Sequence, residues 1–446
     1  MTPTLQPALL SALRSQGGHA TSSDLQQRLG VSQPTVSRAL SPALASGLVV
    51  KVGAGRSQRY LLPRTVEGVG SLVLIHAIQA DGTLAPFGTL YPLNPGGYWM
   101  DEIDKIHGQS AFHESLPWFL YDMRPQGFLG RAFAGQHPGL HLPPQLLHWS
   151  DDHILKALVN AGEDLPGNLL LGASAFDRYQ ALPPPAHSLA PVVTNPATDY
   201  PAMALRALSD PLPGSSAGGE QPKFTAVRNG HPVLVKFSPG GDSPVDQRWR
   251  DLLICEALAL HTLQDAGIAA AHTELVLAAS RVFLESRRFD RTPQGRVGMV
   301  SLETYDGKYI GKGNNWVTTA EFMDRAGTER LSPANVQTLR LLDAYGALIA
   351  NDDRHHGNIS LLLHDHRWHL APTYDMLPML YRPIAGELVP RDFASTALRP
   401  SVHTLAVWPQ ACELAVRFWE TAAQDERISA GFRELAWRNG ETVKAL

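Results

Sequence analysis

The chain has 446 residues, and at about 100 to 200 residues per domain this length corresponds to two to four domains. With 44% hydrophobic and 18% charged residues, the composition is that of a globular protein and excludes a disordered or collagen-like chain. No apolar run approaches the ~18 residues of a membrane span, and the first residues lack a secretory pattern, so we expect a cytoplasmic protein with no membrane partner. The two cysteines, Cys255 and Cys412, are too few for a disulfide framework or a cysteine-rich zinc site.

Charge is distributed unevenly along the chain. Residues 1–64 contain seven basic residues and one acid, a formal charge of +6, which leaves −10 for the rest of a chain whose total is −4. A basic segment ahead of an acidic body predicts that the N-terminal segment binds a polyanion such as DNA.

Residues 1–66 are predicted to form a winged helix-turn-helix domain. A leucine-rich helix ends at Gly17, Ser22 or Ser23 can cap a second helix that ends at Gly30, and a third helix begins after Ser32. The outer face of this third helix carries the side chains that we expect to contact bases or phosphates, which are Gln33, Thr35, Ser37 and Arg38.

The segment after the third helix alternates apolar and polar residues around a glycine-containing turn, which predicts a two-stranded wing. We expect Arg56 and Arg59 of this hairpin to contact phosphates or a minor groove. Pro42 is expected to end or kink the third helix near Ser41, because proline removes a backbone hydrogen bond. The alternative for the whole domain is a structural or dimerising module.

Residues 67–200 are predicted to form a β-rich region that ends in a proline-rich connection. Apolar strands on either side of an Asp81-Gly82 turn are followed by loop and helix patterns. Six prolines lie between Pro183 and Pro201, and we expect neither a helix nor a central strand there, because proline lacks the backbone N–H. Residues 201–446 are predicted to form the catalytic region.

The most specific pattern lies between Asn351 and Asp375. Asp353 precedes Asn358 by five residues, the interval at which a protein-kinase catalytic loop places its base and its magnesium-binding amide. A predicted hairpin then returns the chain, so that Asp375 lies near this loop. We therefore predict that Asp353 orients a hydroxyl and accepts its proton, while Asn358 and Asp375 bind Mg2+.

Two alternatives apply to the same segment. Each of the two aspartates could instead cap a surface turn, which is a common role for this residue type. A zinc site would draw on the histidines of the segment, which are His355, His356, His364, His366 and His369. However, a hairpin separates their faces, and no cysteine or glutamate completes such a site.

Features upstream of this segment follow the order found in a protein kinase. A strand over residues 231–237 places Lys236 opposite its apolar face, where an ammonium can reach nucleotide phosphates. Glu256 on the following helix lies among apolar residues and needs a cation, for which Lys236 is the candidate. Before the strand, Gly218 and Gly219 lie in a small polar loop whose backbone N–H groups can close on phosphate oxygens.

These residues together resemble the HipA family of toxin serine/threonine kinases, bacterial enzymes with a shortened kinase-like fold. The family's glycine-loop pattern stands here as Ser216, Gly219, Gln221 and Lys223, and its catalytic-loop pattern as Asn351, Asp353, His355 and Asn358. Its metal element stands as Tyr374 and Asp375, and its adenine-holding segment as Arg288, Phe289, Asp290 and Arg291. The acidic residue usual before this last segment is replaced by Arg287.

The resemblance implies an α+β protein in which the winged helix-turn-helix precedes a two-lobed kinase with a β-rich N-lobe and a helical C-lobe. It implies ATP and Mg2+ as cofactors. The implied catalytic residues are Asp353, Lys236 and His355, and the implied nucleotide contacts are Ser216, Gly218, Gly219, Lys236, Glu256, Arg287, Phe289, Asn358 and Asp375. It also implies inhibitory autophosphorylation of Ser216, with the adjacent Ser215 as an alternative acceptor.

One departure is architectural, because the DNA-binding antitoxin of the best-known systems in this family is a separate protein, whereas a winged helix is fused here. We expect DNA and an unidentified protein substrate as partners, and a homodimer is left open. Three functions stay in contention. The first and favoured one is an ATP-dependent protein kinase, the second a DNA-binding regulator with a non-catalytic kinase-like body, and the third a magnesium-dependent nuclease using Asp353, His355 and Asp375.

Overall fold

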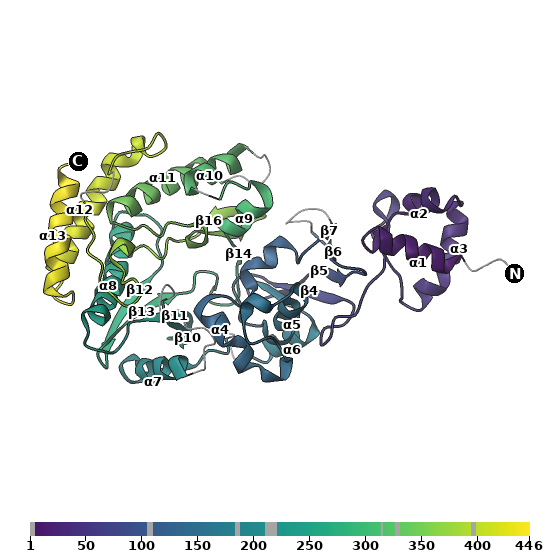
Figure 1. Cartoon of the computed structure of the whole chain (residues 1–446), viewed down its shortest axis with the longest axis horizontal. Coiled ribbons are helices and arrows are strands. Elements are labelled where there is room, and N and C mark those ends of the chain that lie inside the picture. Colours follow the sequence, from purple (N-terminus) through teal and green to yellow (C-terminus); the bar gives the residue numbers. More distant parts are fainter. Residues whose placement is uncertain are drawn as a thin grey trace. The chain divides into compact units, whose positions relative to one another are not determined.

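The computed structural model describes residues 5–104, 110–182, 188–209, 221–313, 315–325, 331–393 and 398–446, with the backbone alone for Arg56, Asp324 and Arg325. The chain forms two compact units, whose elements are labelled in Figure 1. One unit comprises Met1–Arg124 with His137–Leu182, and the other comprises Pro125–Gln136 with Pro183–Leu446. Among the described helices, none is both long and apolar enough to cross a membrane.

The first unit begins with the winged helix-turn-helix that the sequence predicts. Its elements are α1 (Gln6–Ser15), β1 (His19–Ala20), α2 (Ser22–Leu29), α3 (Gln33–Ala45), β2 (Val50–Val52) and β3 (Arg59–Leu61), with strand order β1-β3-β2. Thr21 caps α2, in place of the predicted Ser22 or Ser23. The Thr21 hydroxyl accepts from the backbone N–H of Asp24 (3.1 Å), and the Asp24 carboxylate accepts from the backbone N–H of Thr21 (2.8 Å). The turn to α3 passes through Gly30 at φ +64°, a left-handed conformation that suits glycine.

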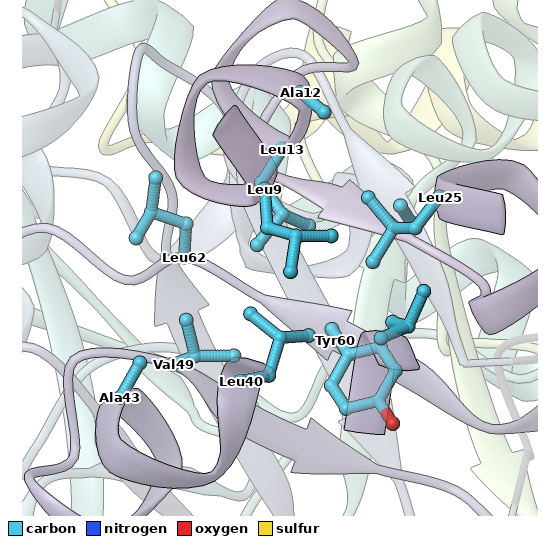
Figure 2. Packing of buried hydrophobic residues seen from close by; sticks show 11 residues of the cluster. Leu9, Ala12, Leu13, Leu25, Leu40, Ala43, Val49, Tyr60 and Leu62 are labelled. Atoms are coloured by element: carbon cyan, nitrogen blue, oxygen red, sulfur yellow. The ribbon is translucent and has the colours of Figure 1, made fainter. Parts of the chain in front are cut away.

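Apolar side chains from the three helices and the wing meet in one small core (Figure 2). Leu9, Leu13, Leu25, Val36 and Leu40 are all fully shielded from solvent. Truncating one such leucine to alanine typically costs about 2–5 kcal/mol. The domain is therefore held together by packing, which leaves the polar face of α3 free for other contacts.

The α3 helix continues through Pro42 to Ala45, so the prediction of a shortened third helix was wrong. Leu40 and Ala43 lie on either side of this proline in the sequence, and both are fully buried. Their burial stabilises the helical path, although Pro42 cannot donate a hydrogen bond to the carbonyl of Arg38.

The rest of the first unit is built on an antiparallel sheet with strand order β7-β6-β5-β4-β8. Its elements are β4 (Val73–Ile78), β5 (Leu84–Pro92), β6 (Tyr98–Glu102), β7 (Ala111–His113), α5 (Asp151–Ala161), β8 (Leu169–Leu171) and α6 (Ala173–Gln180), with short 3-10 turns at Trp118–Met123, Pro138–Leu140 and Leu146–His148. The predicted strands around Asp81-Gly82 are confirmed as β4 and β5. Leu170 of β8 and Tyr179 of α6 pack with Ile78 of β4, so helix and sheet share a core.

The second unit contains a sheet with strand order β12-β13-β11-β10-β9. The elements in and around this sheet are α4 (Gly127–Gln136), β9 (Val192–Val193), α7 (Pro196–Ser209), β10 (Lys223–Arg228), β11 (His231–Phe237), α8 (Pro244–Asp265), β12 (Thr273–Ala278) and β13 (Arg281–Arg287).

The proline-rich segment before β10 is more ordered than the sequence predicts. β9 pairs in parallel with β10 at the edge of the sheet, a position that nearby prolines tolerate. The expectation that no helix forms here was wrong, because α7 runs through Pro201. Val193, Tyr200 and Met203 are buried in the core under the sheet, and this burial offsets the hydrogen bond that Pro201 cannot make.

The C-terminal part of the second unit is mainly helical. Its elements are β14 (Gly298–Ser301), α9 (Leu302–Tyr309), α10 (Trp316–Arg325), α11 (Pro333–Leu348), β15 (Ser360–His364), β16 (Arg367–Leu370), α12 (Trp408–Gln424) and α13 (Ala430–Lys444), with strand order β14-β15-β16. The predicted hairpin is confirmed as β15 and β16. α12 and α13 pack side by side (Figure 1), and the Trp419 indole N–H of α12 donates to the Leu348 carbonyl at the end of α11 (2.9 Å). This bond fixes the point at which the chain leaves α11.

Replacing Pro42 by alanine restores a backbone donor inside α3. We expect P42A to stabilise α3 by about 1–3 kcal/mol, seen as slower amide hydrogen exchange of residues 36–45 in the full chain. P34A is the matched control, because a proline in the first helical turn gives up no intrahelical bond. Equal effects of the two substitutions would contradict this account of Pro42.

Candidate active site

A buried ion pair joins the central strand of the second unit to its longest helix. Lys236 lies on β11 and Glu256 on α8, and the Lys236 ammonium donates to the Glu256 carboxylate at 2.7 Å. The Glu256 side chain is only 3% exposed. Burial lowers the pKa of Lys236 from its ordinary value, and the nearby Glu256 carboxylate opposes that shift. The prediction that Glu256 pairs with Lys236 is therefore confirmed.

Asp375 meets the same ammonium from the other side. Its carboxylate accepts a second hydrogen bond from Lys236, so one lysine links two acids that are 119 residues apart in sequence. The backbone at Asp375 is left-handed, at φ +53°. The preceding residue, Tyr374, donates its hydroxyl hydrogen to the Gly357 carbonyl (3.0 Å), and its oxygen lies 2.8 Å from the hydroxyl of Ser360. The Asp375 element is thus tied to both β11 and the loop that follows α11.

That loop contains Asp353 and Asn358 in a fixed relation. The Asn358 side-chain amide donates to the backbone carbonyl of Asp353 at 2.8 Å, and the amide oxygen of Asn351 accepts from the Asp353 backbone N–H at 3.0 Å. The Asp353 carboxylate makes no hydrogen bond or ion pair with any residue that the structure describes. It borders a hollow of about 260 Å³, whose lining is Asn315, Trp316, Asp343, Asp352, Asp353, Arg354 and His355. A carboxylate that is positioned through its backbone and open to a hollow is suited to accept a proton from a bound hydroxyl.

The donor atoms next to this loop fit a magnesium ion. The Asn358 amide group donates through its nitrogen, and its oxygen accepts no hydrogen bond from the described residues. Asp375 contributes carboxylate oxygens, of which one contacts Lys236. An amide oxygen and a carboxylate are the hard ligands that Mg2+ prefers, usually together with water and substrate phosphates. Asn358 and Asp375 would hold the ion, and the ion would supply positive charge to phosphate oxygens.

The two neighbouring histidines of the loop occupy different environments. His355 is exposed, and its ring accepts from the Gly357 backbone N–H (3.0 Å), so its visible contact stabilises the turn. His356, which the sequence offered only as a member of the alternative zinc site, is buried, and burial lowers its pKa. Its ring lies 2.9 Å from the hydroxyl of Thr319, which donates to the buried Asp306 carboxylate (2.9 Å). The two histidines differ in burial because His356 begins a short 3-10 turn and His355 precedes it. A turn this short has no repeating apolar pattern from which the buried histidine could be predicted.

Residues expected near adenine have different neighbours. Phe289 packs against Tyr374 with 5.6 Å between ring centroids, which places it beside the Asp375 element. Arg287 is exposed at the end of β13, and its guanidinium lies 2.9 Å from the ring of His231.

The predicted phosphate-loop residues Ser216, Gly218 and Gly219 lie outside the described residues. Gln221 is the first described residue after this loop, and its side-chain amide donates to the backbone carbonyl of Phe237, the residue after Lys236 (2.5 Å).

In the winged helix, the predicted reading face of α3 is exposed. Gln33, Ser37 and Arg38 are exposed and Thr35 is half-buried. The Arg38 guanidinium makes one weak local bond, to the Pro34 carbonyl (3.3 Å), and is otherwise free among the residues that the structure describes. These side chains form a continuous polar face of the kind that enters a major groove.

The wing, however, is packed against the sheet of the same unit. The Arg59 guanidinium lies over the ring of Trp99 on β6, 5.5 Å from its centroid, and the Arg59 side chain is half-buried. His19 of β1 lies 5.4 Å from Trp99 and 4.9 Å from Phe112 by ring centroids. Burial and the nearby Arg59 charge lower the pKa of His19. The side chain of Arg56, the other predicted wing contact, is outside the description.

Comparison with known proteins places each part of this chain. The model of the MarR family matches residues 1–59, that of the YjjJ-like toxin, middle domain matches residues 69–180, and that of the HipA-like C-terminal domain matches residues 215–436. Toxin YjjJ of Escherichia coli (strain K12) is 34% identical over 438 residues, with 96% of each chain covered. The chain belongs to the YjjJ-like family of HipA-like toxins. Its N-terminal helix-turn-helix is thus a fused part of a HipA-like protein.

A solved structure supports the fold of this HipA-like chain. HipA of Shewanella oneidensis MR-1, determined with HipB and its operator DNA, has a TM-score of 0.52 at 15% identity, covering 83% of this chain and 96% of that one. This likeness confirms the α+β class and the kinase-like fold behind the helix-turn-helix. Within that fold, Lys236, Glu256, Asp353, Asn358 and Asp375 come from four separate segments, because Asp353 and Asn358 share one loop, and the segments are linked by the contacts described above.

Removing the carboxylate of Glu256 should expose the electrostatic role of this residue. E256Q leaves Lys236 buried with one acid, and we expect a loss of about 3 kcal/mol in the free energy of unfolding at pH 7. Because the pKa of Lys236 is lowered on folding, the unfolded chain binds more protons and stability rises as pH approaches the ordinary lysine value of about 10.4. The deficit of E256Q should therefore shrink with rising pH in denaturant titrations.

E274Q is the matched control for E256Q. Glu274 is 50% exposed and pairs with Arg228 at 3.1 Å, so its loss should cost less than about 1 kcal/mol. A deficit of E256Q that stays constant from pH 7 to pH 10 would contradict the pairing with a charged Lys236.

Proposed function

We propose that this protein is an ATP- and magnesium-dependent serine/threonine protein kinase of toxin–antitoxin type, with a DNA-binding domain in the same chain. The observation that carries the proposal is the Lys236 ammonium held between Glu256 and Asp375, beside a loop whose Asp353 carboxylate is open to a hollow. Phosphoryl transfer depends on positioning and on charge stabilisation, and these side chains supply both.

In this proposal each residue of the site has one task. Lys236 donates to nucleotide phosphates and is itself held in place by Glu256. Asn358 and Asp375 would hold Mg2+, which would supply positive charge to phosphate oxygens. Asp353 accepts a hydrogen bond from a serine or threonine hydroxyl and orients its oxygen toward the terminal phosphorus of ATP. As the new O–P bond forms, Asp353 takes the hydroxyl proton, and the bond from that phosphorus to the bridging oxygen breaks, so that ADP leaves. A protein that presents such a hydroxyl is the unidentified substrate.

The two aspartates should fail in different ways when they are changed. D353N should lower phosphate transfer from labelled ATP by about 10²- to 10⁴-fold while nucleotide binding is retained, because only the base is lost. D375N should also weaken Mg2+-dependent binding of a fluorescent ATP analogue, because a metal ligand is lost. D365N is the matched control, since Asp365 lies in the exposed β15–β16 turn and asparagine also tolerates its left-handed backbone. Normal turnover of D353N would rule out this assignment of the base.

The same assay separates the alternatives. Cell lysate and the purified chain are incubated with labelled ATP and Mg2+, and labelled proteins are identified by mass spectrometry, with a plasmid-nicking reaction run in parallel. DNA binding without phosphate transfer would favour a non-catalytic regulator, and nicking that is lost in D353N would favour a nuclease. Autophosphorylation of Ser216 forms part of the proposal through the family resemblance, and phosphate on that residue in the parent but not in D353N would support it.

We also propose that the N-terminal domain binds DNA through α3. The support comes from the exposed polar face of α3, the +6 charge of residues 1–64 and the match to the MarR family. The Shewanella HipA structure contains operator DNA, which is a property of that complex. A HipA-like kinase that binds an operator in cis would combine in one chain the functions that separate toxin and antitoxin proteins divide. A homodimer would allow the chain to bind two half-sites.

Arg38 and Arg59 should differ in what they contribute. R38A should weaken binding to a DNA duplex selected from a random pool by about 1–3 kcal/mol, measured by fluorescence anisotropy, and should leave thermal stability unchanged. R59A should reduce the stability of the unit by about 0.5–2 kcal/mol through the lost contact with Trp99, and should change DNA affinity little. If R59A weakens DNA binding as much as R38A does, the wing reads DNA directly and its docking on the sheet is not its main role.

A further inference from the structure

A side chain that the proposed mechanism leaves without a task lies between the two acids of the site. Asn351 is 2% exposed and begins the loop after α11. Its amide oxygen accepts from the backbone N–H of Asp353 (3.0 Å), and its amide nitrogen donates to the backbone carbonyl of Asp375 (3.4 Å). One buried amide therefore contacts the residue proposed as the base and the residue proposed as a metal ligand.

The backbone on both sides of this bridge is in an unusual conformation. Ala350 has φ +61° and Asp375 has φ +53°, and both are non-glycine residues in the left-handed region. Such residues persist where the surrounding structure holds them, and they cluster at functional sites. Of the residues that the structure describes, Asn351 alone donates a hydrogen bond to the Asp375 carbonyl. The bridge therefore joins two backbone positions that the surrounding structure must hold in place.

Other contacts fix Asn351 itself. Its backbone N–H donates to the Gly346 carbonyl of α11 (2.8 Å), and its backbone carbonyl accepts from the Arg354 guanidinium. The carbonyl of Ala350 accepts from the Leu380 backbone N–H (3.0 Å), beyond the Asp375 element. The amide nitrogen also donates to the sulfur of Met376, the residue after Asp375, at 3.6 Å. The amide thus projects from an anchored backbone, so its hydrogen bonds can set the position of their partners.

We propose that Asn351 is a positioning residue that holds the base loop and the metal-binding element in one register. The inference rests on the proposed kinase function, because it assigns a purpose to the distance between Asp353 and Asp375. Asn351 reaches both residues through their backbones and leaves both carboxylates free for chemistry. Its loss should therefore displace the Asp375 carboxylate relative to Asn358 and weaken the pair as a magnesium site. Outer partners of this kind commonly change metal affinity by about 10- to 100-fold.

The experiment uses the full chain and measures binding separately from turnover. Binding of a fluorescent ATP analogue is titrated with Mg2+ in the parent, in N351A and in N351S, whose hydroxyl is too short to reach both partners. Both variants should need about 10- to 100-fold more Mg2+ for half-maximal binding. N439A is the matched control, because Asn439 is also buried, donates its side-chain amide hydrogen to the Tyr381 hydroxyl (2.8 Å) and itself lies 64 residues after Asp375. Its Mg2+ requirement should equal that of the parent, and thermal unfolding of each variant reports how much folded protein is present.

The outcomes separate the inference from the function on which it rests. A shifted Mg2+ requirement in N351A or N351S, with N439A unshifted, supports the positioning role. If the parent binds the analogue and transfers phosphate, and the folded Asn351 variants show the parental Mg2+ requirement, the positioning role is overturned while the kinase function stands. The same shift in N439A overturns it as well, since the effect would then follow general destabilisation. A parent that neither binds the analogue nor transfers phosphate overturns the kinase function itself.

Discussion

The second unit depends on one buried cation. Lys236 lies in the middle of a sheet, and its ammonium is shared by Glu256 of α8 and Asp375 of the segment after β16. A buried charge costs free energy unless it is paired. Pairing of Lys236 with Glu256 and Asp375 therefore links β11 to α8 and to the segment after β16. Burial lowers the pKa of Lys236, and the Glu256 carboxylate opposes this shift by favouring the charged form.

Non-covalent contacts of this kind hold together the distant segments that form the site. Asp353 and Asn358 are set by their own loop, and the tyrosine before Asp375 holds that loop through the Gly357 carbonyl. The loop begins just after Leu348, whose carbonyl accepts a hydrogen bond from Trp419 of α12. The packing of α12 on α11 therefore helps to fix the position of Asp353, the proposed base. Charge pairing positions one half of the site and backbone hydrogen bonding positions the other.

Sequence reasoning could predict the parts of this protein that follow from local rules. The helices of the N-terminal domain follow from the spacing of residues such as Leu9 and Leu13, and the contact between Lys236 and Glu256 follows from the cost of a buried charge. The course of α3 and α7 through Pro42 and Pro201 could not be predicted, because tertiary burial outweighs a local penalty there. The bridging hydrogen bonds of Asn351 likewise depend on left-handed backbone at Ala350 and Asp375, and an alanine in this conformation gives no local sequence signal. Local propensity and tertiary packing disagree at these points, and packing decides.

The number of basic residues in the N-terminal domain overstates the number that can contact phosphates. Seven basic residues predict a strong polyanion site, but the structure uses two of them internally. Arg59 covers the Trp99 ring, and Arg64 forms two hydrogen bonds with the Asp152 carboxylate at 2.6 and 2.8 Å. At most five of the seven are left to contact phosphates, and each contact adds about 0.9 to the slope of log affinity against log salt. Arg59 ties β3 to β6, and Arg64 ties the segment after β3 to α5, so the orientation of α3 depends on the middle domain of the same unit. Under the proposed DNA binding, a change in the middle domain would therefore act through geometry and not through charge.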